Sequence, residues 1–138
     1  MTLQKYTNSL SKDRQFEVAI RLTKLTLPIW NNYVNTNPLT YRDTVVGLTH
    51  TVDKEILKDT IDAVEGYLNS TKIKKIIGGT SELKKIRRQF DDPIVALQDL
   101  DWELPYEVQT TFYAVYNLID TLLGKEKTVF AERSEKRR

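Results

Sequence analysis

Apolar residues that recur every three or four positions are the feature that most constrains the fold of this chain. The most regular run is Ile56, Leu57, Ile61, Val64, Tyr67 and Leu68. This spacing places all six side chains on one face of a helix of about four turns. Asp53 stands where it can cap the first turn, and Asn69-Ser70 follows the last apolar residue. The pattern predicts an amphipathic helix over residues 53–70.

The same periodicity extends over most of the chain. Further helices are predicted from Ser11 to Val34 with a kink or restart at Pro28, from Tyr41 to about His50, and over residues 80–88, 93–100 and 105–124. Gly124 is expected to end the last helix, and Val129-Phe130 to fold back onto the body. The core stripe predicted for this helix is Val108, Phe112, Val115, Leu118, Ile119 and Leu122. No convincing pair of strands is evident. The predicted fold class is all-α, a compact single-domain bundle of about six to eight helices.

The length of 138 residues suits one domain with a core of its own. Residues 1–130 are predicted to form this helical domain, and residues 131–138 a charged tail that we expect to be disordered. Hydrophobic residues make up 40% of the chain and charged residues 29%, which favours a globular protein over a disordered one.

The chain contains no cysteine, which excludes disulfides, thiolate chemistry and cysteine-based zinc sites. Its first residues lack the apolar segment of a signal peptide, and no stretch reaches the roughly 18 apolar residues of a membrane span. We therefore expect a soluble protein of the cytoplasm.

Charge is strongly polarised along the sequence. Residues 72–88 contain seven bases and one acid, Glu82, whereas residues 89–124 contain seven acids and no lysine or arginine. Outside the basic tail the chain is neutral overall. Polarised surfaces steer partners and orient docking, so this pattern favours a macromolecular partner over a small substrate.

Signals for catalysis are weak. His50 is the only histidine, and near a predicted helix end its placement needs no catalytic role. Asp59 with Asp62, or Asp91 with Asp92, offer paired carboxylates for a metalloenzyme, but such pairs are usually solvated faces or helix starts. The segment 78–81 (Gly-Gly-Thr-Ser) lacks the lysine and spacing of a phosphate-binding loop. No enzymatic activity, metal site or cofactor is predicted.

The segment from Gln98 to Glu107 alternates acids with large apolar residues and lies between two predicted helices. Aromatic anchors ringed by acids suit a basic protein partner. The predicted partner-binding residues are Asp91, Asp92, Asp99, Asp101, Trp102, Glu103, Tyr106 and Glu107. An alternative places Trp102 and Leu104 in the core, with Glu107 complementing the start of the last helix.

The basic segment 72–88 supports a second hypothesis, a helical protein associated with nucleic acid through its lysines and arginines. No aromatic residue lies among these bases to stack on unpaired nucleobases. Pairing with the acidic segment or simple solvation of a short helix would explain them equally.

Two resemblances add to these patterns. Leu22, Pro28 and Trp30, followed by Tyr41-Arg42, resemble the uncharacterised YjaG-like helical family of bacteria, in which a helix carries the Tyr-Arg pair. The sequence Thr23-Lys24-Leu25 departs from the Cys-Glu-Arg of that family. The resemblance implies an all-helical fold and no activity.

In size, cysteine-free composition and its acidic patch with aromatics, the whole chain also resembles immunity proteins of contact-dependent growth inhibition and other bacterial polymorphic toxin systems. This resemblance implies binding and neutralisation of a cognate toxin domain, a basic nuclease being the expected partner, by occlusion of its active site. It implies no direct contact with nucleic acid and no membrane.

Overall fold

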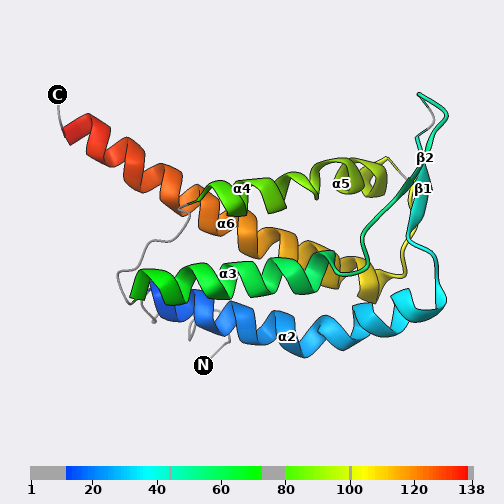
Figure 1. Cartoon of the computed structure of the whole chain (residues 1–138), viewed down its shortest axis with the longest axis horizontal. Coiled ribbons are helices and arrows are strands. Elements are labelled where there is room, and N and C mark those ends of the chain that lie inside the picture. The colour runs from blue at the N-terminus through cyan, green and yellow to red at the C-terminus, as the bar shows by residue number, and fades with distance from the viewer. Residues whose placement is uncertain (1–11, 44, 73–79, 100, 137–138) are drawn as a thin grey trace.

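A computed structural model of the chain describes residues 12–43, 45–72, 80–99 and 101–136, with side chains from residue 14 to residue 124 except 71 and 72. The elements in chain order are α2 (Lys12–Thr36), β1 (Thr40–Arg42), β2 (Thr49–Thr51), α3 (Ile56–Lys72), α4 (Ser81–Arg88), α5 (Asp91–Gln98) and α6 (Tyr106–Lys136) (Figure 1). The predicted helical class is confirmed. The described ranges hold fewer helices than the six to eight expected, and they include a small two-stranded sheet.

Helix α6 lies at the centre of the bundle. It packs against α2, α3 and α4. In Figure 1 it lies between the pair α2 and α3 and the pair α4 and α5. Every position of its predicted apolar stripe is buried: Val108, Phe112, Val115, Leu118, Ile119 and Leu122. The stripe is therefore confirmed as the core face of the helix.

Helix α3 forms where the periodicity was strongest. Oδ1 of Asp53 accepts a hydrogen bond of 3.0 Å from the backbone N–H of Glu55, and the carbonyl of Asp53 accepts one of 3.1 Å from Ile56. This confirms Asp53 as the residue that caps the helix. The apolar face is buried, but the helix continues beyond Asn69-Ser70 to Lys72.

The two prolines inside helical segments act differently. Helix α2 runs through Pro28 as one element, so the chain does not restart there. Pro93 stands in the first turn of α5, four residues after Gln89, the C-cap residue that follows α4. Because proline lacks an N–H and its ring clashes with the carbonyl four residues earlier, Pro93 accounts for the break between α4 and α5.

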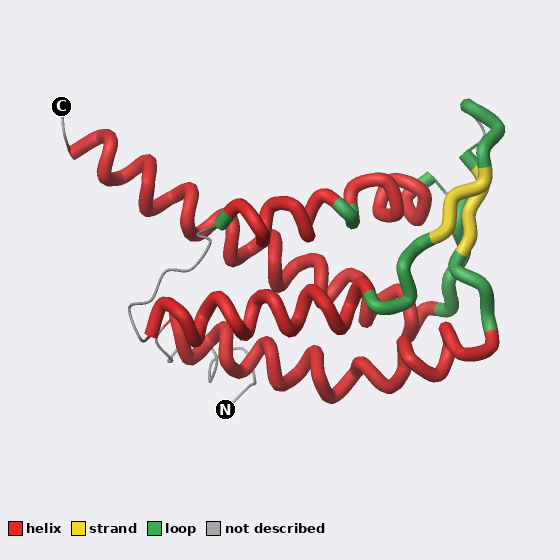
Figure 2. The backbone as a smooth tube through the Cα atoms, in the orientation of Figure 1, coloured by secondary structure: helices red, strands yellow, loops and turns green. Residues whose placement is uncertain are grey.

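The helix predicted from Tyr41 to His50 is wrong, since these residues form an antiparallel hairpin. Tyr41 pairs with His50 in the antiparallel register. Figure 2 shows the two strands side by side. The segment is rich in threonine and valine, which favour extended backbone, and Gly47 has a φ of 74° that few other residues adopt. Of the apolar residues whose spacing resembled a helix, Tyr41 lies in β1, whereas Val45 and Leu48 lie in the connection between the strands.

The end of the last helix also differs from the prediction. Gly124 lies inside α6, which continues through residues 125–136 and extends beyond the other helices at the end opposite the hairpin (Figure 1). The backbone stays helical through Val129-Phe130, where a fold-back was predicted, and through residues 131–136 of the predicted tail. The predictions for Ser11, for residues 73–79 and for Leu100 lie outside the described residues.

Candidate protein-binding surface

Trp102 lies in the core and is 4% exposed. Its ring meets Phe112 of α6 edge-on at 5.7 Å between ring centroids, and Tyr41 of β1 at 5.8 Å. The backbone N–H of Trp102 donates a hydrogen bond of 3.2 Å to the carbonyl of Ala96. Leu104, two positions further along the chain, is also buried. Of the two interpretations of Trp102, the structure supports the core position, so Trp102 is not an exposed anchor.

This burial fixes the orientation of the residues around it. Asp101 and Glu103 flank Trp102 in the chain and are exposed, because Trp102 and Leu104 hold the intervening backbone against the bundle. We call the exposed residues of this segment the acidic surface: Asp99, Asp101, Glu103, Tyr106 and Glu107. Tyr106 is 80% exposed at the start of α6.

The carboxylates of the acidic surface have no lysine or arginine partner among the described side chains, whose ion pairs all lie elsewhere. Glu107 is in the first turn of α6, where a negative charge complements the helix dipole. The acidic surface therefore presents uncompensated negative charge beside one exposed aromatic ring.

Asp91 and Asp92 are separate from this surface. Both lie in the first turn of α5, as predicted, roughly 10 Å along the helix from Asp99 at its other end. Asp91 Oδ1 lies 3.8 Å from Nη1 of Arg87. Asp92 lines a pocket of about 350 Å³ between the hairpin and the junction of α4 and α5. Of the eight predicted residues, Trp102 is therefore buried and Asp91 lies within ion-pair distance of Arg87.

The strands of the hairpin contact the segment that carries the acidic surface, because Tyr41 of β1 packs against Trp102. The ring of Tyr41 contacts that of His50 at 5.3 Å as well as that of Trp102. Burial raises the pKa of the Tyr41 phenol above its ordinary value, and the negative charges of Asp92 and Asp43 raise it further. His50 therefore lies in strand β2 against an aromatic ring, not at a helix end.

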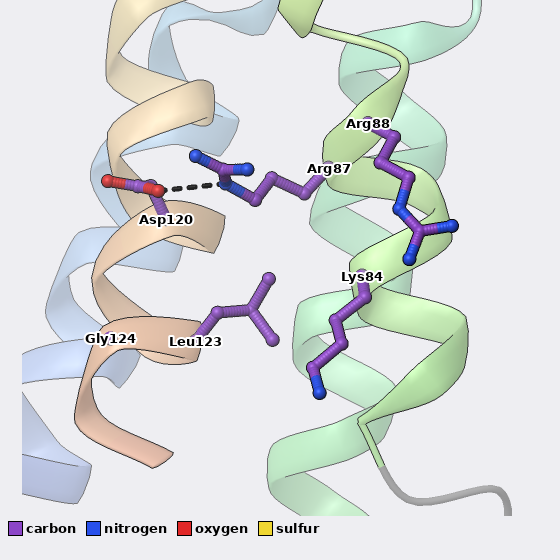
Figure 3. Close-up of a pocket in the computed structure, with 6 residues that line it drawn as sticks. All are labelled: Lys84, Arg87, Arg88, Asp120, Leu123 and Gly124. Carbon is purple, nitrogen blue, oxygen red and sulfur yellow. Dashed lines mark hydrogen bonds and ion pairs between the residues drawn. The ribbon is translucent and has the colours of Figure 1, made fainter. Parts of the chain in front are cut away.

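The basic residues of α4 surround a second pocket, of about 290 Å³, which α6 closes with Asp120, Leu123 and Gly124. Arg87 points across the gap to Asp120, whereas Lys84 and Arg88 lie along α4 (Figure 3). Lys84, Lys85 and Arg88 are exposed.

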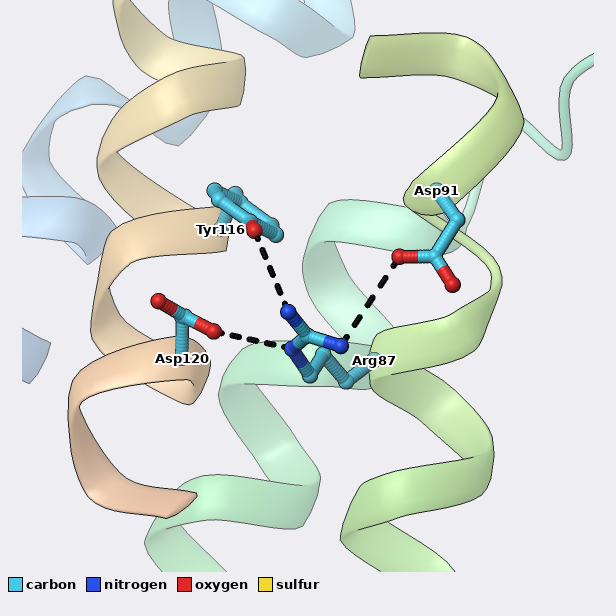
Figure 4. A network of polar contacts seen from close by, with 4 residues as sticks. All are labelled: Arg87, Asp91, Tyr116 and Asp120. Carbon is cyan, nitrogen blue, oxygen red and sulfur yellow. Dashed lines mark hydrogen bonds and ion pairs between the residues drawn. The ribbon is translucent and has the colours of Figure 1, made fainter. Parts of the chain in front are cut away.

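Arg87 is the member of this basic group that the fold uses. Its Nε donates a hydrogen bond of 2.8 Å to Asp120, its Nη2 lies 3.4 Å from the hydroxyl of Tyr116, and its guanidinium carbon lies 5.9 Å from the centre of the Tyr116 ring (Figure 4). The hydrogen bond to Asp120 raises the pKa of Arg87. The predicted pairing of basic and acidic segments is therefore seen at Arg87, which joins α4 to α6.

Among the described residues no three histidine, aspartate or glutamate side chains are grouped closely enough to hold a metal ion. Asp59 and Asp62 are exposed on α3. Thr80 precedes α4 without a capping hydrogen bond from its side chain, and Gly78-Gly79 lie outside the described residues.

The sequence patterns missed a group of exposed apolar residues at the hairpin tip. Val45 is 92% exposed, Val46 64% and Leu48 56%. In the predicted helix Val45 and Leu48 belonged to a buried face. The combination of threonines and valines around a single glycine was the available signal for a hairpin instead.

No protein-family profile matches the chain, and neither a curated protein nor a solved structure is significantly similar to it. Both resemblances noted above therefore rest on the sequence patterns alone. The Tyr-Arg pair that suggested the YjaG-like family lies in strand β1 and not in a helix. In the described part of the chain, no helix has the length and apolar character needed to cross a membrane.

Proposed function

We propose that this protein binds and neutralises a cognate bacterial toxin domain, as an immunity protein of a contact-dependent or related toxin system. The observation that supports this proposal is the acidic surface, whose carboxylates are exposed, lack basic partners among the described residues and are displayed by a backbone that Trp102 holds in the core. A rigid, unpaired negative surface complements a basic cleft such as that of a nuclease.

The mechanism is occlusion without catalysis. Asp99, Asp101 and Glu103 take the place of substrate phosphates against lysines and arginines of the toxin, while Tyr106 supplies an exposed aromatic contact. The protein needs no cofactor for this role and acts in the cytoplasm of the producing cell, before the toxin reaches its substrate.

The test is co-purification with the domain encoded by the adjacent gene, followed by calorimetric titration. We expect a stoichiometric complex with nanomolar affinity and loss of toxicity of the neighbouring domain. The double substitution Asp99→Lys and Asp101→Lys should weaken binding at least tenfold. The matched control, Asp59→Lys with Asp62→Lys on α3, reverses the same number of exposed charges and should leave affinity unchanged. No complex with the neighbouring domain would overturn the proposal.

The alternative is association with nucleic acid through α4, favoured by the exposed side chains of Lys84, Lys85 and Arg88. Arg87 is a weaker candidate for phosphate because Asp120 already accepts its hydrogen bond. Gel-shift binding that is lost when Lys84, Lys85 and Arg88 are reversed to glutamate would favour this alternative over the inhibitor.

A further inference from the structure

The tip of the β1–β2 hairpin exposes three large apolar side chains within four positions, Val45, Val46 and Leu48. Single exposed apolar residues are common on proteins, whereas a group of them on a projecting element indicates a contact surface. The hairpin projects from the end of the molecule at which α5 ends and α6 begins (Figure 1). The tip therefore stands clear of the bundle at the same end as the acidic surface.

Hydrogen bonds join the described residues of the tip to one another despite their exposure. The N–H of Asp43 donates a hydrogen bond of 2.8 Å to the carbonyl of Leu48, and the N–H of Gly47 donates one of 2.7 Å to the carbonyl of Asp43. Oδ1 of Asp43 accepts hydrogen bonds from the N–H groups of Val45 at 2.9 Å and Val46 at 3.2 Å. These bonds tie Asp43 to the four described residues Val45 to Leu48, so those residues would lose less conformational freedom when a partner binds.

The root of the hairpin is tied to the core by a chain of aromatic rings. Tyr41 contacts His50 across the strands and Trp102 in the acidic segment, and Trp102 contacts Phe112 of α6. The carbonyl of Leu39 also accepts a hydrogen bond of 2.8 Å from Val52. The hairpin that carries the apolar tip and the segment that carries the acidic surface consequently pack into the same core.

We propose that the hairpin tip is the apolar anchor of the toxin interface and inserts into an apolar cleft rimmed by basic residues on the partner protein. This inference rests on the proposed function and assigns to Val45, Val46 and Leu48 the role that sequence reasoning gave to Trp102. Apolar side chains at the centre of an interface with charged residues around them are the usual arrangement of a protein-binding site.

Charge favours a basic partner over other occupants. Asp43 lies directly beneath the tip, Asp53 and Asp92 line the pocket beside the hairpin, and the acidic surface lies beyond its root. Among the described residues Arg42, Lys54 and Arg88 are bases close to these carboxylates, and the carboxylates outnumber them. The excess of carboxylates would repel an anionic lipid surface, and it would repel the same end of a second copy of the chain.

The test uses the full chain and the domain encoded by the adjacent gene as the titrant. We expect the double substitution Val45→Ser and Val46→Ser to weaken binding at least tenfold with an unchanged thermal midpoint, because both side chains are exposed. The matched control is Leu25→Ser, which removes an apolar side chain of 76% exposure from α2 and should leave affinity unchanged. If the double variant fails to fold, Leu48→Ser alone provides the same comparison.

The outcomes separate this inference from the proposed function. Wild-type binding that is lost on charge reversal at Asp99 and Asp101 but stays within twofold in the Val45→Ser, Val46→Ser variant would overturn the hairpin anchor alone. Absence of wild-type binding would overturn the proposed function and the anchor with it. Sedimentation of the free chain as a dimer, converted to a monomer by the valine substitutions, would also overturn the anchor by assigning the tip to self-association.

Discussion

Trp102 and Tyr106 lie in the same acidic stretch but have opposite environments, since the first is 4% exposed and the second 80%. Trp102 precedes α6 and turns inward onto Phe112 and Tyr41, while Tyr106 begins the helix on its outer face. An aromatic residue among acids is thus not by itself an interface residue. What decides the role is whether the adjacent elements leave space for the ring in the core.

We predict that Trp102→Ala lowers the free energy of unfolding by about 3–5 kcal/mol, because it removes a fully packed aromatic side chain and leaves a cavity. Urea titration of the purified variant measures this change. Tyr106→Ala is the control and should alter stability by no more than about 0.5 kcal/mol, as for other surface substitutions. Unchanged stability of Trp102→Ala with weakened partner binding would restore Trp102 as an interface anchor.

A second prediction concerns Tyr41 and pH. Burial and the charges of Asp92 and Asp43 raise the pKa of its phenol, so the folded state favours the neutral form. Below the unfolded pKa of about 10 this contribution to stability is fully present, and it is lost as pH rises through the higher folded pKa. We therefore expect stability to fall less steeply above pH 10 in Tyr41→Phe than in the wild type.

The measurement is the urea midpoint of both proteins at several pH values between about 8 and 11, the range in which tyrosines titrate. The remaining tyrosines ionise in both chains, so the difference between the two curves isolates Tyr41. Curves that run parallel across this range would contradict the raised pKa.

At the scale of elements, the helices follow local periodicity, whereas the hairpin and the junctions depend on particular residues. Gly66 and Gly47 illustrate the contrast. Gly66 lies inside α3, and a Cβ there would meet no atom within 4 Å; Gly47 has equal space but a φ of 74°. The same substitution should therefore have opposite effects at the two glycines.

We predict that Gly66→Ala stabilises the protein by about 0.5–1 kcal/mol, because alanine loses less backbone entropy in a helix than glycine. Gly47→Ala should destabilise it by about 1–2 kcal/mol, since an L-residue is strained at positive φ. Paired urea titrations of the two variants test both signs. A stabilising effect at Gly47 would mean that the hairpin connection adopts another conformation.

Arg87 shows how a single residue joins elements. Its hydrogen bond to Asp120 connects α4 to α6, and its 3.8 Å approach to Asp91 spans the break before α5. Both carboxylates belong to the base-free stretch of the sequence. Part of the charge polarity therefore serves the fold, and the part available to a partner is the acidic surface together with Asp92.

At the scale of the whole molecule, the acidic surface and the projecting hairpin occur at one end of the described structure, while α6 extends at the other (Figure 1). A partner steered by charge would approach the hairpin end in a preferred orientation. This arrangement is consistent with the neutral overall charge of the body, because steering depends on the distribution of charge and not only on its sum.

We predict that the association rate with the toxin domain falls steeply as salt is added, because ions screen exposed charges beyond about 10 Å at 0.1 M. Stopped-flow mixing at several salt concentrations measures this dependence. Reversal of Asp99 and Asp101 to lysine should flatten it, whereas reversal of Asp59 and Asp62 should not. An association rate independent of salt would remove the acidic surface from the mechanism.

The sequence located the stretch of chain that carries much of the candidate site, but not which of its side chains are exposed together. The alternation of acids with Trp102 and Leu104 located these carboxylates between two helices, and the structure shows that Asp99, Asp101, Glu103 and Glu107 are exposed. It did not reveal that Asp120 accepts a hydrogen bond from Arg87, 33 positions earlier, or that the exposed apolar group lies in another segment. These relations join residues far apart in the chain, so no local pattern contains them.

The sequence by itself determined the helical class, the capped helix at Asp53 and the core stripe of α6, because periodicity and capping act within a few residues. Only the tertiary structure decided that Tyr41 to His50 form strands, that Trp102 is buried and that α6 continues past Gly124. The strands needed pairing across the hairpin, and Trp102 needed the rings of Phe112 and Tyr41 around it. Such contacts stabilise a conformation only once distant segments have met, and for that reason local propensity did not predict them.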